Sequence, residues 1–340
     1  MLNHIEPLLG KTLQELQAIA QEVGLPRFAG KQLAEWLYVR RATTFDEMTN
    51  ISLKGREALK ERYTVGRYAP IAEAISKDGT KKYLFQIGEQ FVESVYLPED
   101  DRATLCVSTQ AGCKMGCKFC MTGTLGFHGH LAAADILNQI FSIPDADKLT
   151  NIVYMGEGEP MDNLDNVLSS LEVMTSPWGC AWSPKRITIS SVGINKGLKR
   201  FIEESDCHLA ISLHNPFGAE RQEIMPIEKV NQLSDVLALL KQYDWSHQRR
   251  VSFEYICWGG VNDTAKHAKE LVRILKGLDC RINLIRFHAG VNQSFPNSNE
   301  KQMEWMRDYL TTKGITTTIR RSRGEDILAA CGMLVNALKS

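Results

Sequence analysis

The chain has 340 residues, of which 44% are hydrophobic and 24% are charged, and its formal net charge is zero. These proportions are those of a globular protein with a sizeable core, and they exclude a disordered or collagen-like chain. No apolar run approaches the ~20 residues that a membrane span needs, and we expect no signal peptide. Nine cysteines then favour a reducing compartment, so the sequence predicts a cytoplasmic protein without a membrane partner.

Residues 1–64 are predicted to form a small helical domain. Apolar residues recur at helical spacing from Leu13 to Val23, Gly24-Leu25-Pro26 ends that stretch, and further amphipathic segments follow. A net charge of zero gives no overall basic field, but a local patch can still contact phosphate. Taken singly, each basic group more often only covers a surface. The candidate groups are Lys31, Arg40, Arg41, Lys54, Arg56, Lys60, Lys199-Arg200, Arg249-Arg250 and Arg320-Arg321-Ser322-Arg323.

Residues 65–98 change from a helical to an alternating pattern and predict a β-hairpin with strands at Lys82–Ile87 and Phe91–Leu97. Glu93 on the second strand shares a face with apolar side chains. A buried carboxylate is costly unless it is paired, here with Lys81 or Lys82, or unless a raised pKa is useful. The sequence leaves both interpretations open.

From residue 99 to residue 340, short apolar runs alternate with amphipathic helical stretches. Strand-then-helix repetition predicts parallel strands and right-handed crossovers. The fold class is therefore α/β, a partial (β/α) barrel of the TIM type, with reactive groups at the carboxyl ends of the strands. The predicted strands are Leu105–Ser108, Ile152–Met155, Ile187–Ser190, Leu209–Leu213, Val251–Ile256, Ile282–Phe287 and Thr316–Ile319. The predicted helices are Ala133–Ile143, Leu164–Met174, Leu233–Gln242, Ala265–Leu275 and Lys301–Thr312.

Three cysteines, Cys113, Cys117 and Cys120, are spaced C-x3-C-x2-C between a predicted strand and a glycine-rich stretch. Most iron–sulfur clusters have four thiolate ligands, so three thiolates leave one iron of a [4Fe–4S] cluster open to a small molecule. The alternative is a Cys3His zinc site completed by His128 or His130. The spacing resembles that of the radical S-adenosylmethionine (SAM) enzymes, whose open iron binds the amino and carboxylate groups of SAM.

Polar residues follow three of the predicted strands. The first group is the glycine turn Met155-Gly156-Glu157-Gly158-Glu159-Pro160, whose backbone can approach a ligand closely. Ser190 and the run Ser212-Leu213-His214 end the next two strands, where hydroxyls and an imidazole could bind a ribose or a carboxylate. Each of these residues taken alone is more often a cap. Cys331 lies in a polar loop and is followed by a glycine, a setting that suits a thiolate nucleophile.

Together these stretches closely resemble the RlmN/Cfr family of radical SAM methyltransferases over essentially the whole chain, and most of all its RlmN branch. The most specific stretches are Val92–Tyr96, Leu105–Gln110, the cysteine triplet, Gly158-Glu159-Pro160, Ser212-Leu213-His214 and Ala330-Cys331-Gly332. The resemblance implies that Cys113, Cys117 and Cys120 ligate one [4Fe–4S] cluster. It implies a methyl-carrying Cys331, a resolving partner Cys106 and a proton acceptor Glu93. It also implies SAM contacts from Gly158, Glu159, Ser190, Ser212, Leu213, His214 and His288.

By the same resemblance, the substrate is carbon 2 of adenine in the peptidyl transferase centre of 23S rRNA and at position 37 of tRNA. SAM is used twice: Cys331 takes a methyl group, and a radical made from a second SAM removes hydrogen from that methyl. The carbon then adds to adenine, and Cys106 releases the product by forming a disulfide with Cys331. The implied partners are the two RNAs and an electron donor of the flavodoxin type, and the chain is expected to be a monomer.

Three alternatives remain open at this point. One is carbon-8 methylation of the same rRNA adenosine, as in the Cfr branch, which shares the reactive residues. The second is a radical SAM activase or small-molecule enzyme, which leaves the Cys106–Cys331 pair unexplained. The third is a zinc-stabilised RNA-binding module without catalysis.

Two residues depart from the family pattern. Glu157 stands where the family usually has methionine and adds a charge near the cofactor. His288 stands where the family usually has asparagine, and we expect it to replace that residue as a hydrogen-bonding group.

Overall fold

The computed structural model describes residues 5–246, 250–288, 295–330 and 332–334. Seven parallel strands follow one another across its main sheet in chain order. They are β6 (Ala103–Cys106), β9 (Asn151–Tyr154), β10 (Ile187–Ser191), β11 (His208–Ser212), β12 (Val251–Cys257), β13 (Cys280–Arg286) and β14 (Thr316–Ile319). Beyond β6 the sheet continues with antiparallel β5 (Gln90–Pro98), β4 (Lys81–Ile87) and β3 (Ala72–Ile75). Strands β14 and β3 are therefore the two edges of an open, curved sheet.

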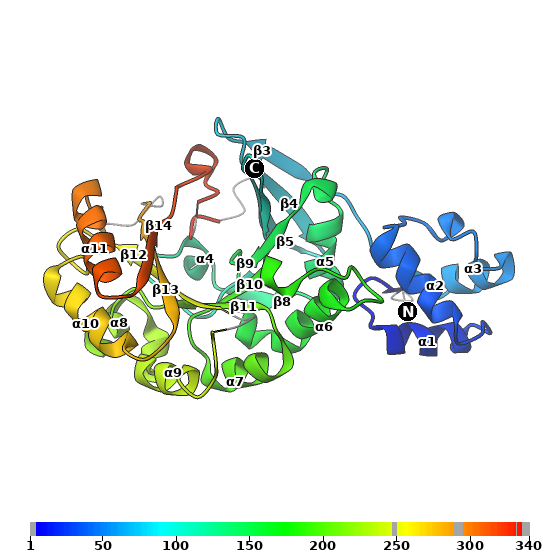
Figure 1. Ribbon diagram of the computed structural model, residues 1–340. Coiled ribbons are helices and arrows are strands. Elements are labelled where there is room, and N and C mark those ends of the chain that lie inside the picture. The colour runs from blue at the N-terminus through cyan, green and yellow to red at the C-terminus, as the bar shows by residue number, and fades with distance from the viewer. Residues whose placement is uncertain (1–4, 247–249, 289–294, 331, 335–340) are drawn as a thin grey trace.

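Helices cover the outer face of this sheet, as Figure 1 shows for α6, α7 and α9. The helices of this part are α4 (Met121–Thr124), α5 (Ala133–Phe141), α6 (Leu164–Thr175), α7 (Asn195–Glu204), α8 (Gly218–Ile224), α9 (Leu233–Leu240), α10 (Ala265–Leu275) and α11 (Glu300–Thr312). Single 3-10 turns occupy Ala146–Lys148, Pro160–Asp162, Pro184–Arg186, Pro226–Lys229 and Glu325–Ile327. A small hairpin of β7 (Gln110–Gly112) and β8 (Phe127–His130) stands apart from the main sheet. The expected partial (β/α) barrel is confirmed.

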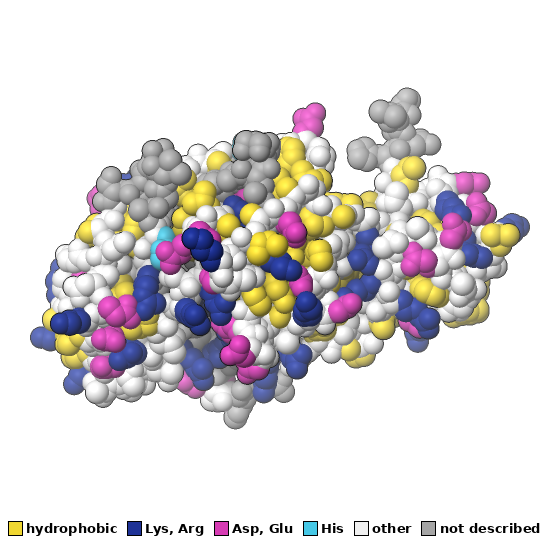
Figure 2. Space-filling model, turned by 90° about the horizontal axis from the view of Figure 1, so that it is seen from above, with side chains coloured by type: hydrophobic (Ala, Val, Ile, Leu, Met, Phe, Trp, Pro, Cys, Tyr) yellow, Lys and Arg dark blue, Asp and Glu magenta, His cyan; other side chains and the backbone are white. Residues whose placement is uncertain are grey.

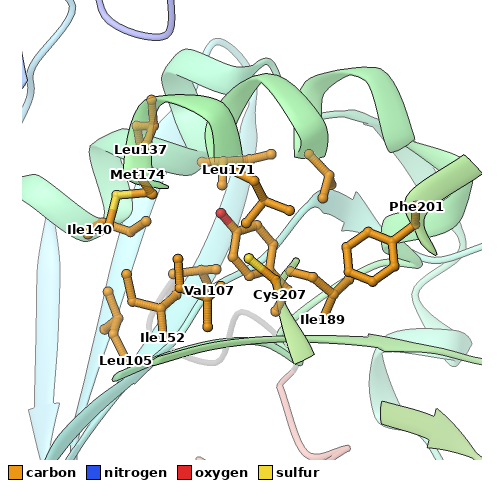
Figure 3. Packing of buried hydrophobic residues seen from close by; sticks show 14 of the residues in the cluster. Leu105, Val107, Leu137, Ile140, Ile152, Leu171, Met174, Ile189, Phe201 and Cys207 are labelled. Carbon is orange, nitrogen blue, oxygen red and sulfur yellow. The ribbon is translucent and has the colours of Figure 1, made fainter. Parts of the chain in front are cut away.

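The core lies between the sheet and these helices (Figure 3). Because side chains alternate along a strand, every second residue of β6, β9 and β10 points at the helices. Leu105, Ile152 and Ile189 are fully buried there against helical residues such as Leu171 and Phe201. Each such side chain contributes roughly 1.5–3 kcal/mol of burial free energy. This packing holds the strands in place, and with them the residues at their carboxyl ends.

The first residues form the expected helical unit at one end of the molecule (Figure 1). It contains α1 (Leu13–Glu22), α2 (Ala29–Ala34) with a π-helical turn Glu35–Val39, the 3-10 turn Phe45–Glu47, α3 (Leu53–Lys60), and the paired strands β1 (Glu6–Pro7) and β2 (Tyr63–Thr64). Thr12 and Glu15 cap α1 reciprocally. Gly30 allows α2 to approach α1, since a Cβ there would lie 2.6 Å from the backbone nitrogen of Gln17.

Several elements were absent from the sequence-based expectation. Helix α7 has the right spacing, with Leu198, Phe201 and Ile202 buried on one face, but polar residues surround these positions. Helix α8 is short, and strands β3, β7 and β8 have only three or four residues each, too few to show a clear alternation. Within the described ranges, no helix combines the length and the apolar character that a membrane crossing requires.

Candidate active site

The loop that carries Cys113, Cys117 and Cys120 is closed by backbone hydrogen bonds. Cys113 N donates to Gly126 O across the β7–β8 hairpin at 2.9 Å, and Cys120 N donates to Cys117 O at 3.1 Å. Gly112, just before the first cysteine, has φ +69°, and a Cβ there would lie 1.9 Å from Gly126 O. Only glycine therefore permits this closure, which holds the three cysteines in one loop, where the thiols influence one another electrostatically.

Burial is the main cause of the raised pKa values of these thiols. It raises the pKa of Cys113 to about 12, and nearby Glu159, Cys120 and Asp162 raise it further. Burial also raises the pKa of Cys117 and of Cys120, and in Cys117 the other two thiols add to the effect. Thiolates so placed need a compensating positive charge, and bound metal supplies it. The donor set thus fits an iron–sulfur cluster.

The histidines considered for a zinc site have protein partners of their own. His130 Nδ1 lies 3.0 Å from Gln110 Nε2, and His128 Nε2 lies 2.9 Å from Leu125 O. Among the described side chains, no three His, Cys, Asp or Glu residues have the geometry of a single-ion site. Ligands of a [4Fe–4S] cluster bind different irons, and so they lie further apart than ligands of one ion.

The glycine turn after β9 lies directly against the strand that leads to the cysteines. Gly158 has φ +98°, and a Cβ there would lie 2.5 Å from the Gln110 side chain. The Glu159 carboxylate accepts Val192 N at 2.9 Å and Met161 N at 3.0 Å. Burial raises the pKa of Glu159 to about 7. Glu159 therefore fastens the ends of β9 and β10 together and shapes the turn.

His214 is held as a neutral imidazole beside the cysteine loop. Its φ is +54°, its Nδ1 accepts Ile256 N at 3.1 Å, and its ring meets Phe119 edge-on at 4.7 Å. Burial, followed by the nearby charge of Arg221, lowers the pKa of His214 to about 3. With Nδ1 accepting, Nε2 carries the proton and is the donor of this ring.

Arg221 on α8 is a site residue that the sequence did not indicate. Its fully buried guanidinium donates to Ser212 O at 2.8 Å, to Val192 O at 2.9 Å and, through Nε, to Leu213 O at 3.0 Å. An ion pair with buried Glu228 balances its charge. Arg221 thus ties the ends of β10 and β11 together, but a lone arginine on a short helix carries no recognisable pattern.

Glu93 forms a buried ion pair with Lys82, at 3.0 Å, and the two side chains are 0% and 1% exposed. The expected pairing with a lysine is thus present, and the partner is Lys82, whereas Lys81 binds Asp145 at 2.6 Å. Lys82 Nζ also donates to Leu328 O at 3.4 Å. The ammonium therefore joins Glu93 to the segment that leads to Cys331.

Glu157 lies beside this pair and is 1% exposed. Its carboxylate accepts Glu93 N at 2.9 Å and Gly112 N at 3.3 Å. Burial raises the pKa of Glu157 to about 8, so at neutral pH the carboxyl is mostly protonated. The negative charge that glutamate would add in place of the usual methionine is thereby largely absent. Through its two hydrogen bonds, the Glu157 side chain links β5 to the cysteine loop.

Cys331 lies outside the described residues, but its neighbours on both sides are described. Met121 N donates to Gly332 O at 2.7 Å, directly after Cys120. Ala329 and Leu334 form one apolar cluster with Val95, against which Cys106 packs. The chain on either side of position 331 thus lies between the cysteine loop and Cys106.

The same segment is fastened to the far edge of the sheet and to His288. Asp326 accepts the Ser76 hydroxyl, and Gly324 N donates to Asp78 at 2.9 Å, both at the β3–β4 turn. His288 Nε2 lies 2.6 Å from Ser322 Oγ, and its Nδ1 lies 3.3 Å from Glu325. His288 thus has its partners in Ser322 and Glu325, on the segment that leads to Cys331.

Several of the candidate basic groups form ion pairs with acidic side chains. Arg41 binds Asp147 at 2.6 Å, Lys60 binds Asp46 at 2.7 Å, and Arg200 binds Asp165 and Glu204. The Arg249 position lies outside the described residues. On the face shown in Figure 2, lysines and arginines are interspersed with acidic residues, in keeping with the zero net charge.

Comparison with known proteins identifies this arrangement. Residues 7–65 match the model of the ribosomal RNA large subunit methyltransferase N-terminal domain, and residues 107–275 match that of the radical SAM superfamily. The chain is 59% identical over 332 residues to a probable dual-specificity RNA methyltransferase RlmN of Bacteroides thetaiotaomicron, covering 97% of this chain and 96% of that protein. The chain belongs to the RlmN family of radical SAM RNA methyltransferases.

A more distant RlmN relative and a solved structure agree with this assignment. The dual-specificity RNA methyltransferase RlmN of Geobacter sulfurreducens is 39% identical over 330 residues, covering 97% of this chain and 92% of that protein. The crystal structure of a radical SAM methyltransferase from Sphaerobacter thermophilus matches with a TM-score of 0.91 and 34% identity, covering 97% of this chain and 99% of that one. The protein is thus an RNA-methylating enzyme, and the resemblance noted in the sequence is confirmed.

Replacing Gly112 by alanine should prevent the cysteine loop from closing, because the new Cβ would overlap Gly126 O. We expect iron and acid-labile sulfide per chain, measured after anaerobic reconstitution, to fall several-fold. Gly116→Ala is the matched control, since Gly116 also has a positive φ of +64° but its Cβ would meet nothing closer than 3.9 Å. Equal iron content in the two variants would contradict the proposed role of this close approach.

Glu157 should make stability fall with rising pH. A carboxyl whose pKa is about 8 when folded and about 4.5 when unfolded stabilises the fold fully below pH 4.5. That contribution is lost between about pH 4.5 and pH 8, at up to about 1.4 kcal/mol per pH unit. Urea unfolding across this window should show the slope, and Glu157→Gln should flatten it. A variant with the wild-type slope would refute the assignment.

Proposed function

We propose that this enzyme methylates carbon 2 of adenine in 23S rRNA and at position 37 of tRNA, in the cytoplasm. Its cofactors would be SAM and one [4Fe–4S] cluster held by Cys113, Cys117 and Cys120. The curated relatives are described as dual-specificity RNA methyltransferases, which supports two classes of RNA substrate. A cluster with an electron donor of the flavodoxin type requires reducing conditions, and this requirement supports a location in the cytoplasm.

The observation that carries the proposal is the position of the chain around Cys331. Gly332 is bound to the residue after Cys120, and Ala329 and Leu334 pack beside Cys106. The described residues on either side of position 331 therefore contact the cysteine loop on one side and the cluster that holds Cys106 on the other. A methyl-carrying cysteine needs both neighbours, one for activation of its methyl group and one for release of the product.

Each reactive residue then has one task. The Cys331 thiolate attacks the methyl carbon of SAM, S-adenosylhomocysteine leaves, and the methyl group is held on Cys331 as a thioether. When bound, the cluster would supply the electron for reductive cleavage of SAM. Glu93, which lies 3.0 Å from Lys82, accepts the proton from the ring carbon once the new carbon–carbon bond exists. The unpaired electron left on the ring would return to the cluster. The Cys106 thiolate then attacks the Cys331 sulfur, so that a disulfide forms and the sulfur–carbon bond breaks, and the product carbon keeps that electron pair and takes up a proton.

The target base must leave its stack to reach these residues, because they lie at the buried strand ends. Residues 1–64 would form an RNA-binding domain, 65–98 a connecting hairpin and 99–340 the catalytic domain. In the first of these, Lys31 and Lys54 are exposed and form no ion pair among the described residues. They are therefore better candidates for phosphate contacts than the paired arginines.

The chemistry is tested by mass spectrometry of 23S rRNA and tRNA from a deletion strain that carries each variant. Cys331→Ala and Cys106→Ala should abolish carbon-2 methyladenosine, whereas Cys280→Ala, a change at a buried core cysteine, should leave it at the wild-type level. Methylation at carbon 8 would instead assign the Cfr activity. A mark that persists without Cys331 would refute the two-cysteine mechanism.

The RNA contact is tested by tRNA binding at several salt concentrations. Replacing Lys31 and Lys54 together by alanine should weaken binding uniformly across tRNAs. It should also reduce the slope of log affinity against log salt by about one for each residue, because fewer counterions are released. Lys276→Ala, a change at an exposed lysine after α10, is the control. Unchanged salt dependence in the double variant would remove these two residues from the interface.

A further inference from the structure

A polar layer crosses the inside of the barrel just below the strand ends. Strand pairing sets Ser212 on β11 beside Glu254 on β12, Glu254 beside Asn283 on β13, and Asn283 beside Thr318 on β14. Phe253 and Tyr255, the neighbours of Glu254 on its strand, belong to the outer core. Glu254 therefore points to the inner face, which it shares with Ile256, and Ile256 clusters with Cys117.

One oxygen of Glu254 makes all the contacts to protein groups. Oε1 accepts Asn283 Nδ2 at 2.8 Å and lies 3.3 Å from Arg320 Nη2 and 3.4 Å from Ser252 Oγ. The other oxygen, Oε2, is buried and accepts no hydrogen bond from any residue that the structure describes. The side chain as a whole is 4% exposed.

This asymmetry does not fit a purely structural ion pair. A carboxylate kept to neutralise an arginine usually meets it with both oxygens, as two parallel hydrogen bonds. A buried carboxylate oxygen without a donor is costly, and the cost is removed only if a donor arrives. Oε2 is thus a buried acceptor that a ligand could satisfy, and the group on that ligand would have to be an N–H or O–H.

The location indicates the ligand. The backbone oxygen of Glu254 accepts Leu213 N at 3.0 Å and His214 N at 3.3 Å, so Glu254 supports the turn proposed to contact SAM. A ribose presents two hydroxyl donors, and a carboxylate at the carboxyl end of a parallel strand is a common partner for them. We propose that Glu254 Oε2 accepts a hydrogen bond from a ribose hydroxyl of SAM. This inference rests on the proposal that SAM binds at these strand ends.

The test measures equilibrium binding of four ligands to the anaerobically reconstituted enzyme. The ligands are SAM, 2′-deoxy-SAM, 3′-deoxy-SAM and the SAM analogue without the adenine amino group. Wild type should bind one of the two deoxy analogues about tenfold more weakly than SAM. Glu254→Gln should bind SAM about tenfold more weakly and no longer distinguish it from that analogue. The analogue without the amino group should lose affinity equally in both proteins.

Ser252→Ala is the matched control, because Ser252 contacts only Oε1, and it should keep the wild-type discrimination. The assignment to ribose would be overturned if Glu254→Gln lost affinity equally for all four ligands. It would also be overturned if the variant no longer distinguished SAM from the analogue without the adenine amino group. If Glu254→Gln holds no cluster, Glu254→Asp replaces it, since the shorter side chain withdraws Oε2. Wild type that binds SAM and both deoxy analogues equally refutes this inference alone, whereas wild type that binds no SAM refutes the proposed function.

Discussion

The buried pair of Lys82 and Glu93 is the interaction on which the arrangement of the active site depends. Neither side chain reaches water, so each charge is tolerated only because the other lies 3.0 Å away. Breaking such a pair leaves one charge buried alone, at a cost of roughly 3–5 kcal/mol. Lys82 also binds Leu328 O, and Glu157 binds Glu93 N. The hairpin, the cysteine loop and the end of the chain are thus joined through one ion pair.

Much of this arrangement could be predicted because its signals are local. The cysteine spacing, the glycine turn and the run Ser212-Leu213-His214 each lie within a few residues, and strand order follows from the alternation of strands and helices. The partner of Glu93 could only be narrowed to two lysines, since a one-residue change of register would exchange their faces. Contacts made by single residues far apart in sequence, such as Arg221 to three strand-end carbonyls, leave no pattern at all.

The two departures from the family pattern show how context changes the meaning of a residue. From sequence, Glu157 adds a charge, but burial raises its pKa to about 8 and largely removes that charge. From sequence, His288 replaces an asparagine near SAM, yet its ring nitrogens face Ser322 and Glu325. Burial and neighbours therefore decide what each side chain does, and neither is visible before the chain is folded.

The open sheet has a consequence for the size of molecule that the enzyme can admit. In a closed barrel the first and last strands share a hydrogen-bonded ladder, and only the rim is accessible. Here β14 and β3 are separate edges, and the segment from Arg320 onward connects them through a few bonds at Ser76 and Asp78. The two edges are thus joined by hydrogen bonds from a loop and not by a strand ladder, so a polymer that must deliver one base meets a loop at this side of the sheet.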